Sequence, residues 1–260
     1  MKISFCLITL NEEENLPRCL KSCAETADEI VIVDCGSTDA TREIAAGFGA
    51  RWLVHEWPGY VAQKNRALAL AQHEWVFSID ADEELSPALR SELAKLKATA
   101  PAPEVGGFSV SRCVFYEGRW IRHGDWYPDR LLRLARRNRG VEFVGGKVHE
   151  RMEVGGTVKH LSGDLHHYSF KDAADHWRRC QKYAQLWAES QWEAGRTAGS
   201  LSPYLHATLR WCRGYLLKRG FLDGRQGWLI ARLISREVFL KYSHLLELQR
   251  NQHRTSNIEL

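Results

Sequence analysis

The feature that most constrains the fold is the alternation of apolar runs with helix-like stretches over residues 3–98. Four apolar runs have the length of a strand: residues 3–10, 29–34, 52–55 and 75–80. Helical patterns follow them in turn: residues 14–25, 38–49, 60–72 and 86–98. Runs that are apolar on both faces are typical of strands in a covered parallel sheet. Strand alternating with helix predicts an α/β fold with an open, doubly wound sheet.

The pattern changes after residue 98. Residues 99–107 are rich in Pro, Ala and Gly and mark a turn or linker, and residues 107–118 alternate as an antiparallel strand does. From about residue 171 onward the chain is mostly helical in pattern. We therefore predict a mixed, mostly parallel sheet flanked by helices in residues 1–170, and a helical extension in residues 171–260.

Composition and cysteine usage limit the class of protein. Of the 260 residues, 44% are hydrophobic and 26% charged, which is ordinary for a soluble globular protein. No run reaches the roughly 18 apolar residues that a membrane-spanning helix needs, and the first residues resemble a strand more than a signal peptide. The seven cysteines are scattered without a CxxC pair, so we predict neither a disulfide framework nor a zinc site, and a cytoplasmic location.

Charge is distributed unevenly along the chain. Residues 1–118 carry 11 basic and 18 acidic side chains, whereas residues 171–260 carry 15 basic and 8 acidic ones. A basic half indicates an anionic partner. No nucleic-acid-binding module accompanies it, so nucleic acid is not expected. Basic residues interleaved with Trp and Leu on helices are typical of a segment lying in a membrane interface, although packing or dimerisation of the helices would also explain them.

Polar residues follow the predicted strands at their carboxyl ends, where an open parallel sheet binds its ligands. The second strand ends in DCGSTD (34–39), an aspartate followed by Gly and Ser that suits contacts with a ribose or a base. The chain lacks both GxGxxG after its first strand and GxxxxGK[ST], which argues against a dinucleotide enzyme and a P-loop ATPase. The positions of Glu12, Glu14 and Glu84 have an alternative explanation, because the helix dipole favours acidic residues at helix N-termini.

The fourth strand ends in DAD (80–82), followed by two glutamates. Carboxylates packed this closely need either open water or a cation. Mg²⁺ or Mn²⁺ takes carboxylate oxygens and keeps its other positions for water and phosphate. We predict that Asp82 binds such a metal and that Asp80 holds a ribose or a metal-bound water. The metal would neutralise a departing diphosphate.

Four segments together resemble the inverting glycosyltransferases of family 2, which have an A-type nucleotide-sugar-binding fold. They are SFCLITLNEEENLPRCLKS, EIVIVDCGSTDATREIA, GYVAQKNRALALAQHEWVFSIDADEEL and GKVHE, within residues 1–151. Two further segments, GRWIRHGDWYPDRLLRLARR and YLLKRGFLDGRQGWLIARL, resemble the lipopolysaccharide core branch of that family, particularly its beta-1,4-glucosyltransferases.

The resemblance implies a role for each matching residue. Those implied to bind a nucleotide-sugar donor, a UDP-hexose, are Thr9, Asn11, Glu13, Asp34, Ser37, Asp39, Lys64, Asn65 and Asp80. His149 matches a position of a third metal ligand or a diphosphate contact. The alternative for Lys64 is that it is a solvent-exposed lysine on a helix, without a role in binding.

An inverting transfer also needs one carboxylate base for the acceptor hydroxyl. The candidates are Asp129, Glu150 and Asp125; Asp129 leads because it falls in the WYPD motif of this branch. A structural ion pair is the alternative for Asp125. The basic stretch 130–139, with Arg151, is expected either to hold phosphates or to form a solvated helix face.

The sequence thus predicts a metal-dependent hexosyltransferase that moves glucose to a lipid-linked acceptor of the lipopolysaccharide inner core. Such an enzyme would be cytoplasmic and peripheral on the inner face of the cytoplasmic membrane. Two alternatives remain. The acceptor could be a polyprenyl phosphate or another envelope glycan, or the protein could be a non-catalytic scaffold that binds a membrane or a polyanion. The intact DAD motif speaks against the scaffold.

Overall fold

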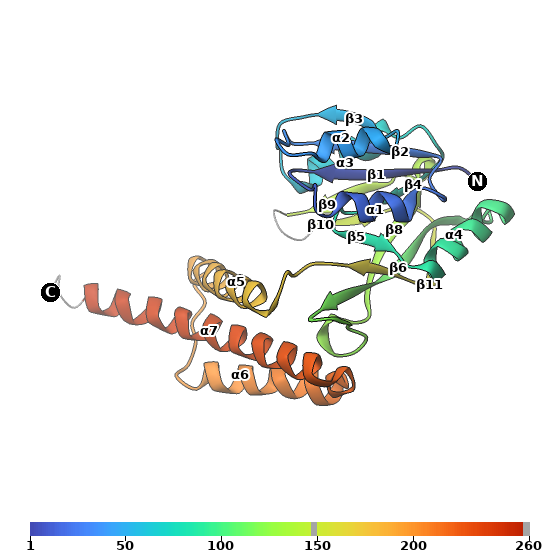
Figure 1. Cartoon of the computed structure of the whole chain (residues 1–260). Helices are drawn as coiled ribbons and strands as arrows, with labels where there is room; N and C mark the ends of the chain where they lie inside the picture. Colours follow the sequence, from blue (N-terminus) through green and yellow to red (C-terminus); the bar gives the residue numbers. More distant parts are fainter. Residues whose placement is uncertain (147–149, 257–260) are drawn as a thin grey trace. The chain divides into compact units, whose positions relative to one another are not determined.

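The computed structural model of the chain describes residues 1–146 and 150–256. The chain divides into two compact units (Figure 1). The first, here called the sheet unit, contains Met1–Cys113 and Asp129–Tyr168. The second, here called the helical unit, contains Val114–Pro128 and Ser169–Leu260. The predicted domain boundary after residue 170 stays a prediction.

The main sheet is mixed, with strand order β3-β2-β1-β4-β8-β6-β11-β5. Its parallel part consists of β1 (Ile3–Thr9), β2 (Glu29–Asp34), β3 (Arg51–Val54) and β4 (Trp75–Ser78). The other strands are β5 (Glu83–Leu85), β6 (Val105–Tyr116), β8 (Asp129–Arg136) and β11 (Thr157–His167). β8 pairs antiparallel with both β4 and β6. The predicted change from parallel to antiparallel pairing is therefore confirmed.

Helices cover both faces of the parallel strands. α1 (Leu16–Cys23), α2 (Thr41–Gly47) and α4 (Pro87–Thr99) pack on one face, over a core that includes the stacked rings of Phe5 and Phe77. α3 (Tyr60–Leu70) covers the other face, together with the hairpin of β9 (Glu142–Gly145) and β10 (Glu150–Glu153). Most residues of β1 are apolar, and successive residues point to opposite faces of the sheet. Both faces of the strand are therefore apolar.

The basic stretch 130–139 does not form a solvated helix face, which is one of the two expectations for it. It is not a helix: β8 contains Asp129–Arg136, and a 3₁₀ turn follows at Arg137–Arg139. Leu134 and Ala135 enter the cores on opposite faces of the sheet. The arginines of RLLRLAR recur every three positions, so the local pattern does not favour a strand; hydrogen bonding to β4 and β6 on its two sides fixes the strand conformation. Glu84 likewise lies in β5 and not at a helix N-terminus.

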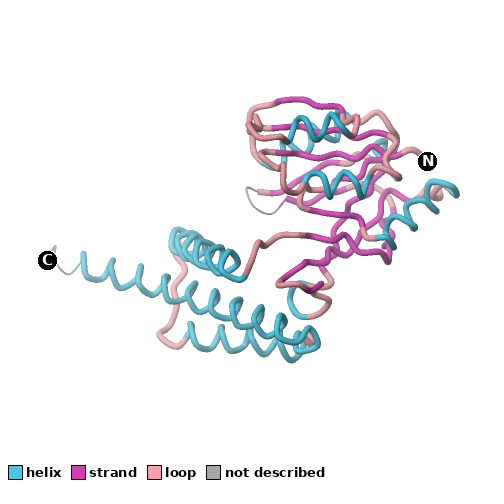
Figure 2. Tube along the Cα trace, in the orientation of Figure 1, coloured by secondary structure: helices cyan, strands magenta, loops and turns pink. Residues whose placement is uncertain are grey.

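The helical unit is built around one long helix. α5 (Ala173–Glu193) and α6 (Ser202–Trp211) both pack along α7 (Gly224–Ser256) (Figure 2). A π-helical turn (Cys212–Leu217) and a 3₁₀ turn (Gly220–Asp223) connect α6 to α7. The short strand β7 (Arg119–Trp120) pairs with the end of β6. In the described part of the chain, none of the helices has the length and apolar character needed to cross a bilayer.

The core of the helical unit is small and aromatic. Buried Tyr116 and Ile121 pack with Ile230 and Ile234 of α7. The predicted helical extension is confirmed. All seven cysteines are free.

Candidate functional site

Asp34 holds together the loops that follow β1 and β2. Its carboxylate is buried and accepts four hydrogen bonds, from Thr9 Oγ1 (2.8 Å), Gly36 N (2.8 Å), Ser37 N (2.7 Å) and Ser37 Oγ (2.5 Å). Gly36 has φ +96°, a conformation that glycine adopts without strain. The loop is therefore fixed in shape before any ligand arrives.

Other residues of these two loops form hydrogen bonds with one another. Asn11 N donates to Ser37 Oγ (2.8 Å), and Asn11 Oδ1 accepts from Thr38 N (2.9 Å). Glu13 N donates to Asp39 Oδ2 (3.2 Å). Six residues expected at the nucleotide site thus form one cluster at the carboxyl ends of β1 and β2: Thr9, Asn11, Glu13, Asp34, Ser37 and Asp39.

Asp80, just after β4, is held between two cations. Its Oδ1 lies 2.9 Å from Lys64 Nζ, and its Oδ2 lies 3.1 Å from Arg133 Nη2. Burial by itself would raise the pKa of Asp80, but the attraction of Lys64 and Arg133 outweighs it and holds that pKa well below its usual range. Asp80 is therefore an ionised carboxylate with a fixed orientation.

Arg133 also binds a second carboxylate that sequence reasoning missed. Its Nη2 lies 2.6 Å from Oε1 of Glu83, which is fully buried. Glu83 Oε2 accepts a hydrogen bond from the backbone N–H of Asp80 (2.9 Å). Burial raises the pKa of Glu83, against the attraction of Arg133. Glu83 and Arg133 thus both bond to Asp80 and hold it in place.

Lys64 links this group to the β9–β10 hairpin. It is buried, and its Nζ lies 3.2 Å from Glu150 Oε1. The alternative of a solvated helix lysine is therefore wrong. Its neighbour Asn65 exchanges two hydrogen bonds with the backbone of Phe143, at 2.9 and 2.6 Å, which ties α3 to β9.

A cavity of about 510 Å³ in the sheet unit opens beside these groups. Its basic lining residues are Lys64, Arg112, Arg130, Arg133 and Arg151, and its acidic ones are Asp80 and Glu150. The excess of positive charge suits an anion with several oxygens, because guanidinium groups bind phosphate in pairs of hydrogen bonds.

Asp82 differs from Asp80 in that it forms no ion pair with a Lys or Arg within residues 1–146 and 150–256. Its side chain is 32% exposed, and its Oδ2 lies 3.1 Å from His167 Nε2. His167 Nδ1 is buried and has no hydrogen-bond partner among the residues that the structure describes. His149, the other expected ligand, lies outside the described residues. Within residues 1–146 and 150–256, no three His, Cys, Asp or Glu side chains are grouped to hold a metal.

The two groups at Asp82 nevertheless fit a divalent metal. Mg²⁺ is usually bound by one or two protein carboxylates and takes its remaining ligands from water and substrate phosphates. One accessible carboxylate beside an imidazole is such a donor set, and Mn²⁺ accepts the same ligands. Sequence reasoning missed His167, because only the pairing of β11 with β5 brings it to Asp82.

The three candidate bases lie in different surroundings. Asp129 Oδ2 accepts a hydrogen bond from Arg112 Nε (3.0 Å) and lies 2.8 Å from Arg112 Nη2 in an ion pair, and its side chain is 40% exposed. Glu150 lines the basic cavity. Asp125 belongs to the helical unit, where it is buried and paired with Arg210 (3.2 Å) and Lys218 (3.0 Å). These contacts favour the structural ion pair for Asp125.

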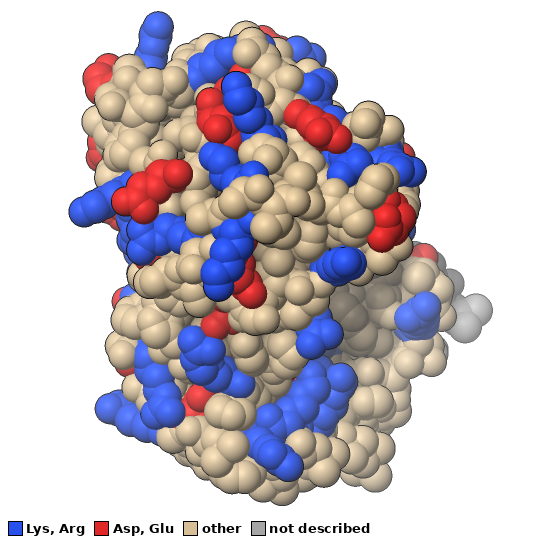
Figure 3. Space-filling view, turned by 90° about the vertical axis from the view of Figure 1, so that its right-hand side faces the viewer, with Lys and Arg blue, Asp and Glu red and all other residues tan. Residues whose placement is uncertain are grey.

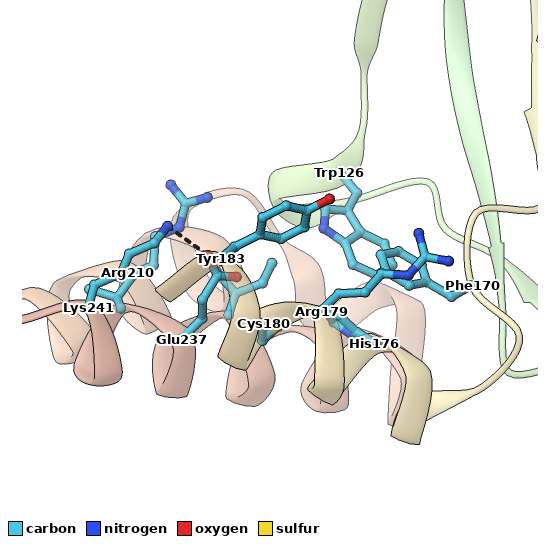
Figure 4. A pocket seen from close by; sticks show the side chains of 11 residues that line it. Trp126, Phe170, His176, Arg179, Cys180, Tyr183, Arg210, Glu237 and Lys241 are labelled. Carbon is cyan, nitrogen blue, oxygen red and sulfur yellow. Dashed lines mark ion pairs between the residues drawn. The ribbon is translucent and has the colours of Figure 1, made fainter. Parts of the chain in front are cut away.

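The helical unit has a cavity of its own, of about 370 Å³ (Figure 4). Trp126 and Phe170 stack in its wall, with ring centroids 5.2 Å apart. His176 bonds to the hydroxyl of Tyr116 at 3.0 Å, and burial lowers the pKa of His176 to about 4. The two cavities share no lining residue.

Comparisons with known proteins agree with the fold. The sequence pattern of "Glycosyl transferase family 2" matches residues 4–153. A lipopolysaccharide core biosynthesis glycosyltransferase, LpsC of Rhizobium meliloti, is 32% identical over 94% of both chains. An uncharacterized glycosyltransferase of Rickettsia typhi is 26% identical over 95% of this chain and 87% of its own length.

A solved structure of glucosyl-3-phosphoglycerate synthase from Mycobacterium tuberculosis is 26% identical over 45% of this chain and 44% of that chain, with a TM-score of 0.34. The family match contains the parallel strands, the DAD motif and the β9–β10 hairpin. The predicted A-type glycosyltransferase fold is therefore confirmed. The chain is a glycosyltransferase and belongs to glycosyl transferase family 2.

Proposed function

We propose that this glycosyltransferase moves a hexose, glucose, from UDP-glucose to a hydroxyl of a lipopolysaccharide inner-core acceptor, with inversion. The observation that carries the proposal is the basic cavity beside Asp80, within the part of the chain that matches the family. The similarity to a protein named for lipopolysaccharide core biosynthesis, over 94% of both chains, supports this acceptor class.

The donor would be bound by two groups of residues. The loop cluster around Asp34, whose shape is fixed by its internal hydrogen bonds, would border the nucleoside. Lys64 and the arginines of the cavity would bind the diphosphate through charge-assisted hydrogen bonds. Asn65 supports this site by fixing β9 against α3.

A divalent metal, Mg²⁺ or Mn²⁺, would be held by Asp82 and His167, with His149 as a further expected ligand. When bound, the metal neutralises the negative charge of the diphosphate. Asp80 then keeps its position because Lys64 and Arg133 hold it.

Asp129 is the proposed base. It would accept the proton of the acceptor hydroxyl while that oxygen bonds to the anomeric carbon and the bond from that carbon to the diphosphate breaks. Its exposed carboxylate can meet a hydroxyl that arrives from solvent. Glu150 is the second candidate, because it lines the cavity.

We place the enzyme in the cytoplasm, attached peripherally to the inner face of the cytoplasmic membrane, where a lipid-linked acceptor would be presented. Residues 171–260 carry 15 basic and 8 acidic side chains, and this excess of positive charge supports the location. Figure 3 shows one face of the molecule, on which many Lys and Arg side chains are exposed.

The test is a panel of nucleotide diphospho-sugars with the full chain and Mn²⁺, in which thermal stability and release of nucleotide diphosphate are both measured. We expect UDP-glucose to raise the melting temperature most and to be turned over, because a ligand that binds only the folded state stabilises it. Turnover of none of these donors would favour the non-catalytic scaffold. Selective turnover of a donor other than UDP-glucose would disprove the assignment of the sugar.

A further inference from the structure

A row of side chains that begins just before α6 and ends in the π-helical turn directs leucines outward. Leu201, Leu205, Leu209, Arg213 and Leu217 follow one another at intervals of four residues. Residues four apart on a helix are neighbours on its surface, one turn apart, so each member of the series adjoins the next. The four leucines are 73%, 57%, 56% and 80% exposed, respectively, and Arg213 is exposed as well. We call these five residues the leucine row.

The same segment buries its small residues. Pro203, Ala207 and Gly214 are buried, while the leucines face away from the core. A helix of a soluble protein normally places its large apolar side chains toward the core. Three further exposed apolar residues, Phe221, Leu222 and Trp228, follow the row in the sequence. Surfaces of this kind mark contact sites for a partner or a membrane.

Charge identifies the partner. Residues 194–222 contain no Asp or Glu, and their basic residues are Arg196, Arg210, Arg213, Lys218 and Arg219. Arg210 and Lys218 are paired with Asp125, whereas Arg213 and Arg219 are exposed. Leucines surrounded by Lys and Arg, without acidic residues, are typical of a helix that lies in the interface of an anionic bilayer. The long basic side chains can reach the headgroups while the leucines enter the acyl region.

A second copy of this chain fits the surface less well. In a symmetric dimer the same patch meets itself, so the arginines of one copy would face the arginines of the other. Like charges placed opposite one another oppose such a contact. An anionic lipid surface meets no such repulsion.

We propose that the leucine row, with its neighbouring basic residues, docks the helical unit on an anionic phospholipid bilayer. The proposed function is the basis only for identifying this bilayer as the inner leaflet of the cytoplasmic membrane. The docking surface itself requires no sugar transfer, so the two can be tested separately.

The experiment is sedimentation of the full chain with vesicles of phosphatidylcholine alone or mixed with phosphatidylglycerol. We expect binding to the mixed vesicles at least about tenfold tighter than to the neutral ones, and weakened by high salt. The variant Leu205→Ser/Leu209→Ser/Leu217→Ser should lose at least about tenfold in affinity for the mixed vesicles. Arg213→Ser/Arg219→Ser should reduce the preference for the anionic lipid.

The matched control is Leu186→Ser, which removes a leucine of α5 that is 50% exposed and should leave binding unchanged. Circular dichroism should show all variants folded, because the replaced side chains are exposed. The proposal is wrong if the triple variant binds the vesicles as the unmodified chain does, or if both vesicle types bind equally. It is also wrong if the unmodified chain binds no vesicles but forms a dimer that the triple variant breaks.

Release of UDP from UDP-glucose, measured without vesicles, separates this proposal from the proposed function. The triple variant should retain the rate of the unmodified chain, since none of its leucines lines the basic cavity. Vesicle binding without any turnover would reject the proposed function and support the docking surface. Turnover without vesicle binding would reject the docking surface and support the proposed function.

Discussion

Arg133 shows how one buried side chain can organise a site. It is 4% exposed and contacts both Asp80 and Glu83. Without it, Glu83 could not ionise in this interior at low cost and Asp80 would keep only Lys64, because a buried charge needs a counter-charge. A sequence pattern cannot reveal this role, since the two carboxylates lie some 50 residues before Arg133 in the chain.

Replacing Arg133 tests this dependence. We expect Arg133→Met to lower the free energy of unfolding by about 3–5 kcal/mol, because it leaves the fully buried carboxylate of Glu83 without its nearest cation. Urea denaturation measures the change. The control Arg130→Met removes an exposed arginine of the same strand and should change stability by less than about 0.5 kcal/mol. Equal stabilities for the two variants would contradict the role given to Arg133.

Asp129 and Asp125 should respond differently to the same substitution. Asp129→Asn should lower the rate of transfer by about 10²–10⁴-fold and leave the Kd for UDP unchanged, because the amide cannot accept the proton. Rates from initial-velocity assays and Kd values from calorimetry measure the two effects. Full activity in this variant would move the base to Glu150 or Asp125.

Asp125→Asn provides the contrast. Its carboxylate is buried between Arg210 and Lys218, so we expect a loss of stability of about 3 kcal/mol. The rate of transfer per folded molecule should stay the same. A loss of rate like that expected for Asp129→Asn, in protein that remains folded, would instead make Asp125 the base.

At the scale of elements, the sequence predicts the parallel strands well and the antiparallel ones less well. β1, β2 and β4 are apolar on both faces, which is a strong local signal. β5 has only three residues, and β8 contains four charged ones, so neither has such a signal. Their strand conformation comes from pairing with β11, β4 and β6, which are distant in the chain.

His176 of α5 makes the stability of the helical unit depend on pH. Its pKa is about 4, below the ordinary value of 6.5, because it is buried against Tyr116. Between these two values the unfolded chain binds more protons than the folded one. The stabilisation is therefore complete above about pH 6.5 and is lost as the pH falls toward 4.

We expect the free energy of unfolding to fall by about 2 kcal/mol between pH 7 and pH 5 through His176 alone. Urea denaturation followed by circular dichroism at the two pH values measures this difference. His176→Gln should reduce the difference by that amount, since glutamine does not titrate. His244→Gln, at a more exposed histidine of α7, should leave it unchanged. An unchanged difference in His176→Gln would show that other groups cause the acid sensitivity.

At the scale of the whole molecule, the candidate site combines a part that can be predicted with a part that cannot. The loop cluster around Asp34 is predictable, because the carboxyl ends of parallel strands meet at one edge of a sheet. The contacts of Arg133 with Glu83 and of His167 with Asp82 depend on the order β4-β8-β6-β11-β5. That order is set by long-range pairing, on which the local pattern of residues carries no information.

Binding of nucleotide couples the site to the stability of the whole fold, and so permits a test of the metal that does not depend on activity. UDP at about 100 times its Kd should stabilise the folded state by about 2.7 kcal/mol. For a chain of this size we expect a rise in melting temperature of about 5 °C in the presence of Mn²⁺. Differential scanning fluorimetry measures the rise.

Excess EDTA should remove most of this rise, because the cavity arginines alone leave the charge of the diphosphate incompletely neutralised. Uridine, which has no phosphate, is the matched control ligand and should give the same small rise with Mn²⁺ and with EDTA. Asp82→Asn should behave in Mn²⁺ as the unmodified chain does in EDTA, because an amide is a weak ligand for a hard cation. A rise with UDP that is unaffected by both EDTA and Asp82→Asn would mean that Lys64 and the arginines bind the diphosphate without a metal.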